Sequence, residues 1–302
     1  MSDCPAIETI GLSKSYGRME AVRDLTLFVG SNCLTGFLGR NGAGKSTTIK
    51  MLLGMVRPTA GYGKVLGRRI DDPAESVEIR RQVAYVSEDK RLYGYMTVEQ
   101  TIRFTSSFYA DWRTDRVAAL LRKFELPLDR KVKSLSKGMR TKLALLLALA
   151  RRPKLLILDE PSEGLDPIGV EQLLECLVAQ SSEGTSVFFS SHQIEEVERI
   201  ADRVCIVERG RLLVDLSMDE IRQSYRQIDL VFPFEPRELE FNLMGVESVR
   251  TEGCQLRVFS SGNTDGIVER ARAYHASSIE VAPVGLREVF LGTVREKSDA
   301  LV

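Results

Sequence analysis

The stretch Gly39-Arg40-Asn41-Gly42-Ala43-Gly44-Lys45-Ser46 decides the fold of this chain. It matches G-x-x-x-x-G-K-[ST], a phosphate-binding loop that connects a strand to a helix. The apolar residues 34–38 before it predict the strand, and residues 47–53 after it predict the helix. Three glycines let backbone N–H groups turn toward an anion, and the helix start adds the positive end of its dipole. The stretch therefore predicts a polyphosphate site in an α/β fold.

Two side chains of this loop have predicted roles of their own. The Lys45 ammonium can neutralise phosphate oxygens, and the Ser46 hydroxyl can ligate the magnesium that accompanies them. An ordinary glycine turn is the alternative, and the strand, the lysine and the hydroxyl together disfavour it. The loop alone does not identify the nucleotide. The loop residues predicted to bind it are Gly39, Asn41, Gly42, Gly44, Lys45, Ser46 and Thr47.

The size and composition of the whole chain narrow its class. A length of 302 residues predicts one large domain or two unequal domains. Lysine and arginine (42) balance aspartate and glutamate (42), so no nucleic-acid surface is expected as the main function. The most apolar stretch, residues 143–150, is far shorter than the roughly 20 residues that cross a bilayer, so no transmembrane helix is expected.

Two further features favour a cytosolic protein. Residues 1–5 lack a basic region followed by an apolar core, so no secretory signal is expected. The five cysteines are scattered and form no C-x-x-C pair, as is typical of reduced thiols.

The segments that flank the phosphate loop predict strands. Residues 7–12 and 25–29 read as two strands with a turn at 14–17, and Tyr16 lies in that turn. An exposed tyrosine there could stack on a purine, although from this residue alone a tyrosine that fills a loop pocket is equally consistent. Residues 57–63 predict a turn, a polar connection follows, and residues 82–86 predict another strand.

The middle of the chain predicts a helical insertion between charged and polar segments. The charged residues 87–91 leave the strand at the end where α/β sheets gather ligands, although a solvated face is the ordinary alternative. Apolar spacing over 97–126 predicts helices. Ser136 and Gly138 lie at the start of a buried helix over 140–152, where free backbone donors favour an anion. Taken alone, Ser136 is more often a helix cap.

A second set of motifs follows two buried strands. Residues 155–158 are apolar and predict a strand buried on both faces, with Asp159 and Glu160 at its carboxyl end. Asp159 would hold magnesium, and Glu160 could polarise a water for attack on a γ-phosphate. Two acids after a strand are common in loops, but their pairing with the phosphate loop favours a site. His192 follows a strand over 185–190 and could reach the same phosphate, although a lone histidine is usually structural.

The predicted secondary-structure pattern changes near residue 215. Residues 203–214 predict a hairpin that turns near 209–210. Beyond it, alternating strands and amphipathic helices predict a small α+β appendage, in which His275 is a surface residue and no catalytic constellation is found.

With these motifs in this order, residues 6–215 resemble the ATP-binding subunits of ABC transporters. The resemblance implies a P-loop NTPase fold of the ABC ATPase type, with a parallel core sheet, an antiparallel β subdomain and a helical subdomain at residues 90–150. It places an ABC domain at 1–215 and an accessory α+β domain at 216–302. It also implies ATP with Mg²⁺ as the ligands.

The family motifs correspond to this chain residue by residue. Tyr16 matches the aromatic that stacks on adenine, and residues 39–46 match the Walker A loop. Asp159 and Glu160 match the Walker B aspartate and the catalytic glutamate, and His192 matches the switch histidine. The resemblance thus implies Glu160, His192 and Lys45 as the catalytic residues.

Two motifs depart from the family pattern. The signature L-S-G-G-Q is Leu135-Ser136-Lys137-Gly138-Met139 here, which leaves Ser136 and Gly138 to contact phosphate. Glu88 stands in place of the Q-loop glutamine, and its carboxylate can still accept from a magnesium-bound water, so Ser46, Asp159 and Glu88 are the expected metal residues. Both variants, and the C-terminal appendage, resemble those of bacterial ATPases that pair with separate membrane subunits for export.

The resemblance implies a cycle of dimerisation. In this cycle, the signature of one chain closes over the nucleotide bound by a neighbour. The neighbour is a second copy of the chain or a related ATPase subunit, and the dimer encloses two ATPs. Hydrolysis of ATP then separates the two subunits. The implied partner is a multi-spanning membrane permease, and the implied location is cytoplasmic, on the inner face of the cell membrane. A soluble ABC ATPase that acts on ribosomes or nucleic acid is the alternative, and a nucleotide-gated regulatory module is another. The sequence does not identify the substrate, because substrate contacts belong to the membrane subunit.

Overall fold

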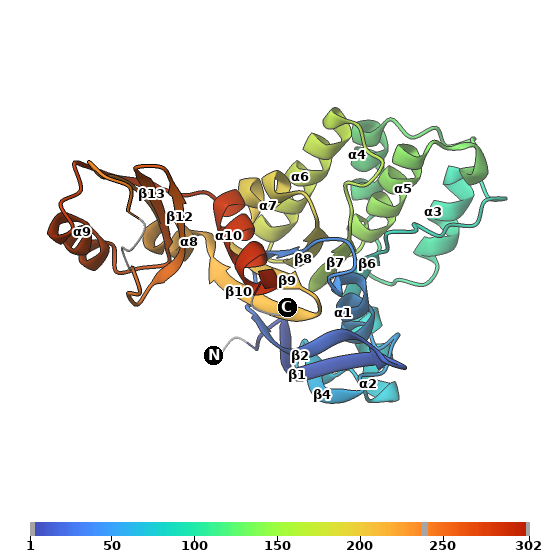
Figure 1. Ribbon diagram of the computed structural model, residues 1–302. Coiled ribbons are helices and arrows are strands. Elements are labelled where there is room, and N and C mark those ends of the chain that lie inside the picture. The colour runs from blue at the N-terminus through green and yellow to red at the C-terminus, as the bar shows by residue number, and fades with distance from the viewer. Residues whose placement is uncertain (1–3, 237–240, 300–302) are drawn as a thin grey trace. The chain divides into compact units, whose positions relative to one another are not determined.

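The computed structural model describes residues 4–236 and 241–299 (Figure 1). The chain divides between Asp215 and Leu216 into two compact units, and each is built around its own sheets. Within the described residues, none of the helices combines the length and the apolar character that a membrane span requires.

The first unit is built on a six-stranded sheet in the order β10-β9-β3-β8-β7-β6. Strand β3 pairs in parallel with β8 and β9, and β7 pairs in parallel with β8 and β6. Every residue of β3, β7 and β8 is buried, as expected of strands covered on both faces. The strands are β3 (Leu34–Leu38), β6 (Val83–Val86), β7 (Leu155–Asp159), β8 (Ser186–Ser191), β9 (Arg203–Glu208) and β10 (Arg211–Ser217).

The register of this sheet brings the predicted motifs to one edge. Leu38, which precedes the phosphate loop, pairs with Ser191, and Asp159 pairs with Ser190. The carboxyl ends of β3, β7 and β8 therefore lie next to one another. This is the edge at which open α/β sheets bind ligands.

Helices cover both faces of the sheet (Figure 1). Helix α1 lies on one face, between this sheet and a second sheet, and α5, α6 and α7 lie on the other. Gly36 marks a close approach, because a Cβ there would stand 2.3 Å from Cγ1 of Val197 on α7. The helices are α1 (Lys45–Leu52), α5 (Lys137–Leu149), α6 (Pro167–Ser182) and α7 (Ile194–Ile200).

An antiparallel sheet in the order β2-β1-β4-β5 packs its apolar side chains against α1. Its strands are β1 (Ile7–Tyr16), β2 (Met19–Val29), β4 (Ala60–Val65) and β5 (Arg68–Arg69). The prediction that Tyr16 lies in a turn was wrong, because β1 continues through Tyr16, which pairs with Met19. Residues 60–63 belong to β4 and not to a turn, because they pair with β1, whose backbone Gly61 approaches closely.

The polar connection predicted after residue 66 contains a helix that the sequence analysis missed. Helix α2 (Pro73–Gln82) begins at Asp72, whose side chain accepts from the N–H groups of Ala74 and Glu75. Its mostly polar sequence lacks a clear apolar period, so its cap and Pro73 were the available signals.

The helices predicted over residues 97–126 are present as α3 (Val98–Ser106) and α4 (Thr114–Phe124). The 3₁₀ turn η1 (Val132–Ser134) and α5 follow them. Helix α3 begins with a capping box between Thr97 and Gln100.

The second unit is a four-stranded antiparallel sheet with helices, as the α+β prediction stated. Its order is β12-β13-β11-β14, and its core includes Ile228, Leu230, Leu256 and Ile267. The elements are α8 (Met218–Ser224), β11 (Arg226–Val231), β12 (Val246–Glu252), β13 (Gln255–Ser260), α9 (Thr264–Ala273), β14 (Ser278–Pro283) and α10 (Leu286–Asp299).

Candidate functional site

The phosphate loop has a backbone that only glycine accommodates at two of its positions. Gly42 and Gly44 have φ values of 83° and 104°, in the left-handed region. A Cβ on Gly44 would stand 2.5 Å from the carbonyl oxygen of Ala21, and a Cβ on Gly39 would stand 2.5 Å from that of Val207. The loop is therefore held tightly around the first turn of α1, whose N–H groups have no partner within the helix.

Lys45 is buried at the centre of this loop, with 6% of its surface exposed. Its ammonium donates to the carbonyl oxygens of Gly39 (2.7 Å) and Arg40 (3.3 Å). It also forms an ion pair with Oε1 of Glu160 at 3.0 Å. The structure thus brings together the lysine of the loop and the predicted catalytic glutamate, which are 115 positions apart in the chain (160 − 45).

Glu160 is the point where the predicted motifs converge. Its other carboxylate oxygen, Oε2, lies 2.8 Å from Nδ1 of His192, and its backbone N–H donates to the Ser190 hydroxyl at 3.0 Å. Its φ of 46° is uncommon for a residue other than glycine. The carboxylate is buried between a cation and an imidazole, so its orientation is fixed.

Asp159 and Ser46 supply oxygen ligands beside Glu160. The Ser46 hydroxyl lies 3.2 Å from Oδ1 of Asp159, and the Ser190 hydroxyl donates to the same oxygen at 2.7 Å. Magnesium takes carboxylate and hydroxyl oxygens and keeps several waters or phosphate oxygens, so this pair fits that ion. Glu88, the third predicted metal residue, is exposed on the wall of the adjoining cavity.

A cavity of about 440 Å³ opens above the loop. Its wall includes the predicted residues Asn41, Gly42, Gly44, Lys45, Ser46, Thr47, Glu88 and Glu160. Met19 and Arg23 of β2, together with Arg209, also line it and were not predicted. Tyr16 does not line it. This residue is 48% exposed, and the Lys14 ammonium lies over its ring, 5.0 Å from the centroid.

Ser136 and Gly138 lie outside this cavity. The Ser136 hydroxyl accepts from the N–H of Met139 at 3.1 Å and so caps α5. A Cβ on Gly138 would stand 2.8 Å from the carbonyl oxygen of Gly164, and the Lys137 ammonium pairs with Glu163 at 2.5 Å. Within one chain, the signature therefore packs against the loop that follows Glu160 and does not reach the cavity wall.

A buried acid behind the site was not predicted from the sequence. Glu196 on α7 accepts from the hydroxyls of Ser162 (2.9 Å) and Ser191 (3.2 Å). Its burial raises the pKa of its carboxyl group above the usual value. The available signal was its place in a short helix, four residues after His192, with its side chain directed inward.

Comparisons with known proteins agree with this geometry. Residues 22–163 match the protein family described as ABC transporter. The chain is 34% identical over 224 residues to the bacitracin transport ATP-binding protein BcrA of Bacillus licheniformis. The aligned region covers 73% of this chain and 72% of that relative. It is 31% identical over 295 residues to the Nod factor export ATP-binding protein I of Mesorhizobium japonicum. Here the aligned region covers 95% of this chain and 86% of that relative.

One solved structure is similar in both sequence and fold. It is titled "Structure of ATP binding subunit of ABC transporter", and it superposes with a TM-score of 0.66 at 33% identity. The match covers 72% of this chain and 92% of that one.

Proposed function

The chain belongs to the ATP-binding subunits of ABC transporters, and on that premise we propose that it hydrolyses Mg²⁺–ATP to power export through a separate membrane subunit. Members of this family bind and hydrolyse ATP, so the chain is an ATPase.

One observation carries the assignment of residues. The Glu160 carboxylate lies between the Lys45 ammonium and the His192 imidazole, at the edge of the cavity that the phosphate loop lines. In our proposal Lys45 binds the phosphate oxygens, Glu160 accepts a proton from the attacking water, and His192 orients Glu160 and the γ-phosphate.

The proposed magnesium ligands are oxygen atoms beside this carboxylate. Ser46 and Asp159 would hold magnesium, with Glu88 reaching it through water, and the ion would neutralise the charge that develops on the phosphates. Ser190 keeps Asp159 in place by donating to the same carboxylate oxygen.

The signature completes the site of a neighbouring copy in this proposal. Ser136 caps α5 and Gly138 lies in its first turn, where the N–H groups have no partner within the helix. Since neither residue reaches the cavity of its own chain, a second ATPase subunit must present them there. Tyr16, at the exposed end of β1, would stack on the adenine.

The helical subdomain presents a surface suited to a membrane subunit. Tyr93, Tyr95, Phe104 and Phe108 are exposed. The Tyr93 ring contacts those of Tyr95 and Phe104, and the Phe104 ring contacts that of Phe108. Exposed aromatic clusters of this kind mark protein interaction sites. The relatives named for bacitracin transport and Nod factor export favour a permease partner at the inner face of the membrane over a ribosome or nucleic acid.

Two experiments test the proposal. Lys45→Ala removes the buried ammonium and should weaken ATP binding, as measured by calorimetry; normal affinity would contradict the proposed phosphate site.

Purification of the tagged chain from membranes should recover a multi-spanning subunit. Recovery with ribosomes or DNA instead would overturn the transporter proposal.

A further inference from the structure

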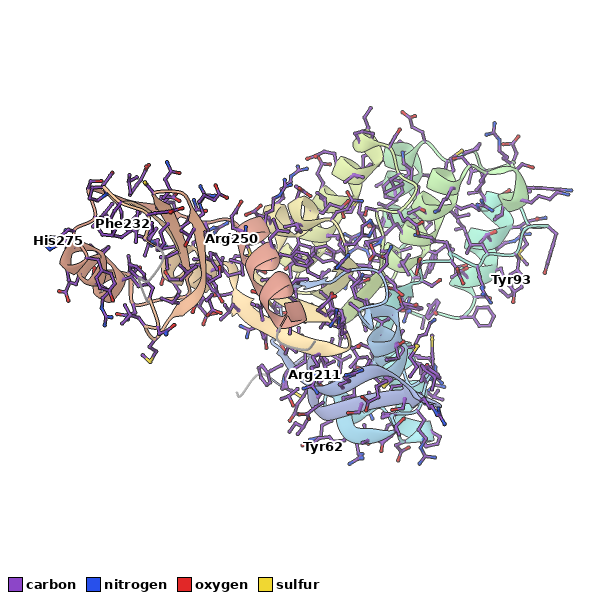
Figure 2. All side chains as sticks on the ribbon, in the orientation of Figure 1. Tyr62, Tyr93, Arg211, Phe232, Arg250 and His275 are labelled. Atoms are coloured by element: carbon purple, nitrogen blue, oxygen red, sulfur yellow. The ribbon has the colours of Figure 1, made fainter. Side chains whose placement is uncertain are left out.

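Lys90 is a buried lysine to which none of the roles above assigns a function. It lies between β6 and α3, among the charged residues 87–91, yet only 7% of its surface is exposed. Tyr93, three residues later, is 54% exposed and lies at the outer edge of the unit, below α3 in Figure 2. Lysine is rarely fully buried unless it is paired, so the position of Lys90 requires a reason.

The Lys90 ammonium has one hydrogen-bond partner among the residues that the structure describes. It donates to the backbone carbonyl oxygen of Glu160 at 3.1 Å, and no carboxylate of the described chain forms an ion pair with it. Burial accordingly lowers the pKa of the Lys90 ammonium. A buried cation with one carbonyl partner disfavours folding, so stability alone does not explain its presence.

The predicted motifs give a role to the side chain of Glu160 but none to its backbone. Its N–H is held by Ser190, and its two carboxylate oxygens are held by Lys45 and His192. The remaining polar group, the carbonyl oxygen, accepts from the Glu163 N–H at 3.3 Å, and Lys90 is the side chain that donates to it. Glu160 adopts a left-handed φ of 46°, so the direction of this carbonyl depends on a conformation that glutamate seldom occupies.

We infer that Lys90 is a positioning residue for ATP hydrolysis: it fixes the backbone of Glu160 so that the carboxylate meets the attacking water. Strands β6 and β7 are adjacent, with Val86 paired to Leu158, so the segment after β6 can reach the end of β7. The inference rests on the proposed role of Glu160 as the base. It adds a residue that acts through Glu160 and does not line the cavity.

The test compares Lys90→Met with Lys90→Arg in the full chain. Lys90→Met removes the donor and should lower kcat at least about tenfold, because small misplacements of a catalytic group are costly. The KM for ATP should change less than about threefold, because Lys90 does not line the cavity. Lys90→Arg keeps a cationic donor and should retain more of the rate than Lys90→Met.

Thermal unfolding separates this role from a structural one. Lys90→Met replaces a buried charge with an apolar chain of similar length, so its Tm should equal or exceed that of the wild type. The control Lys154→Met makes the same change on the exposed lysine at the other end of β7, and should leave kcat unchanged.

Two results would overturn the inference. One is a kcat of Lys90→Met within about twofold of the wild type, a change too small for a positioning role. The other is an equal loss in both Lys90 variants together with a lowered Tm, which would indicate a folding role. If Glu160→Gln and Lys90→Met both hydrolyse ATP at the wild-type rate, the proposed role of Glu160 as the base is wrong. If Lys90→Met does so and Glu160→Gln does not, only the role of Lys90 is wrong.

Discussion

Glu160→Gln changes the charge of one buried side chain and almost nothing else. Glu160 is 6% exposed and lies between the Lys45 ammonium (3.0 Å) and the His192 imidazole (2.8 Å), so an amide of the same shape fits the same space. The amide cannot accept the proton of the attacking water. General-base catalysis contributes about 10²–10⁴-fold, so kcat should fall by that factor, or about 2.7–5.4 kcal/mol in the barrier.

The same substitution should leave ATP binding intact. Without the Glu160 charge, Lys45 loses an anionic partner that competes with phosphate, so the affinity for ATP should be equal or higher. Bound ATP would persist and the dimer would accumulate, which light scattering with and without ATP detects.

Phosphate release measures the rate, and Glu171→Gln is the matched control. Glu171 is an exposed acid on α6 that pairs with Arg199, and surface pairs of this kind contribute little. Glu171→Gln should hydrolyse ATP at the wild-type rate. If Glu160→Gln does so too, Glu160 is not the base and the mechanism proposed for this site is refuted.

Three further predictions concern the metal, the buried acid and the second unit. Ser46→Ala should raise the Mg²⁺ concentration for half-maximal ATPase at least about tenfold, whereas Ser46→Thr keeps the hydroxyl and should not. Burial raises the Glu196 pKa above its usual 4.5, so the native state binds more protons than the unfolded state and its unfolding free energy falls as pH rises through the raised pKa. Glu196→Gln should therefore be at least as stable as the wild type at pH 8 by urea unfolding and lose that advantage below the usual pKa; destabilisation at pH 8 would contradict this. Leu230→Ala should cost about 2–5 kcal/mol in the unfolding of the second unit, with ATP affinity unchanged by calorimetry.

Much of the fold could be predicted because its strands and motifs have strong local signals. Strands β3 and β7 are buried on both faces, and each contains one polar residue, Thr35 in β3 and Asp159 at the end of β7, so their apolar pattern is easily recognised. The helices of the insertion and the hairpin at Arg209 and Gly210 followed from spacing and turn residues. Helix α2 and the first half of β4 were missed because polar residues and glycines obscure their periods, and tertiary contacts decide them.

The site could be predicted where a motif is contiguous in sequence or where a residue follows a predicted strand, as His192 does. Lys45, Asp159 and Glu160 stand in recognisable patterns, and the sheet register brings them together. Ser190 and Lys90 act on Glu160 across the sheet, and a hydroxyl or a lysine in such a position has no sequence pattern of its own. Residues of this kind are found through hydrogen bonds and burial, not through spacing.

The central claim is that each ATP site combines the phosphate loop of one chain with the signature of another. Lys45→Ala disables the loop, and Ser136→Asp disables the signature by charge while an aspartate still caps α5. Each variant alone should be inactive, and a mixture should form dimers with one intact site, so its phosphate release should exceed the sum of the two separate rates. A mixture no more active than that sum would contradict the claim.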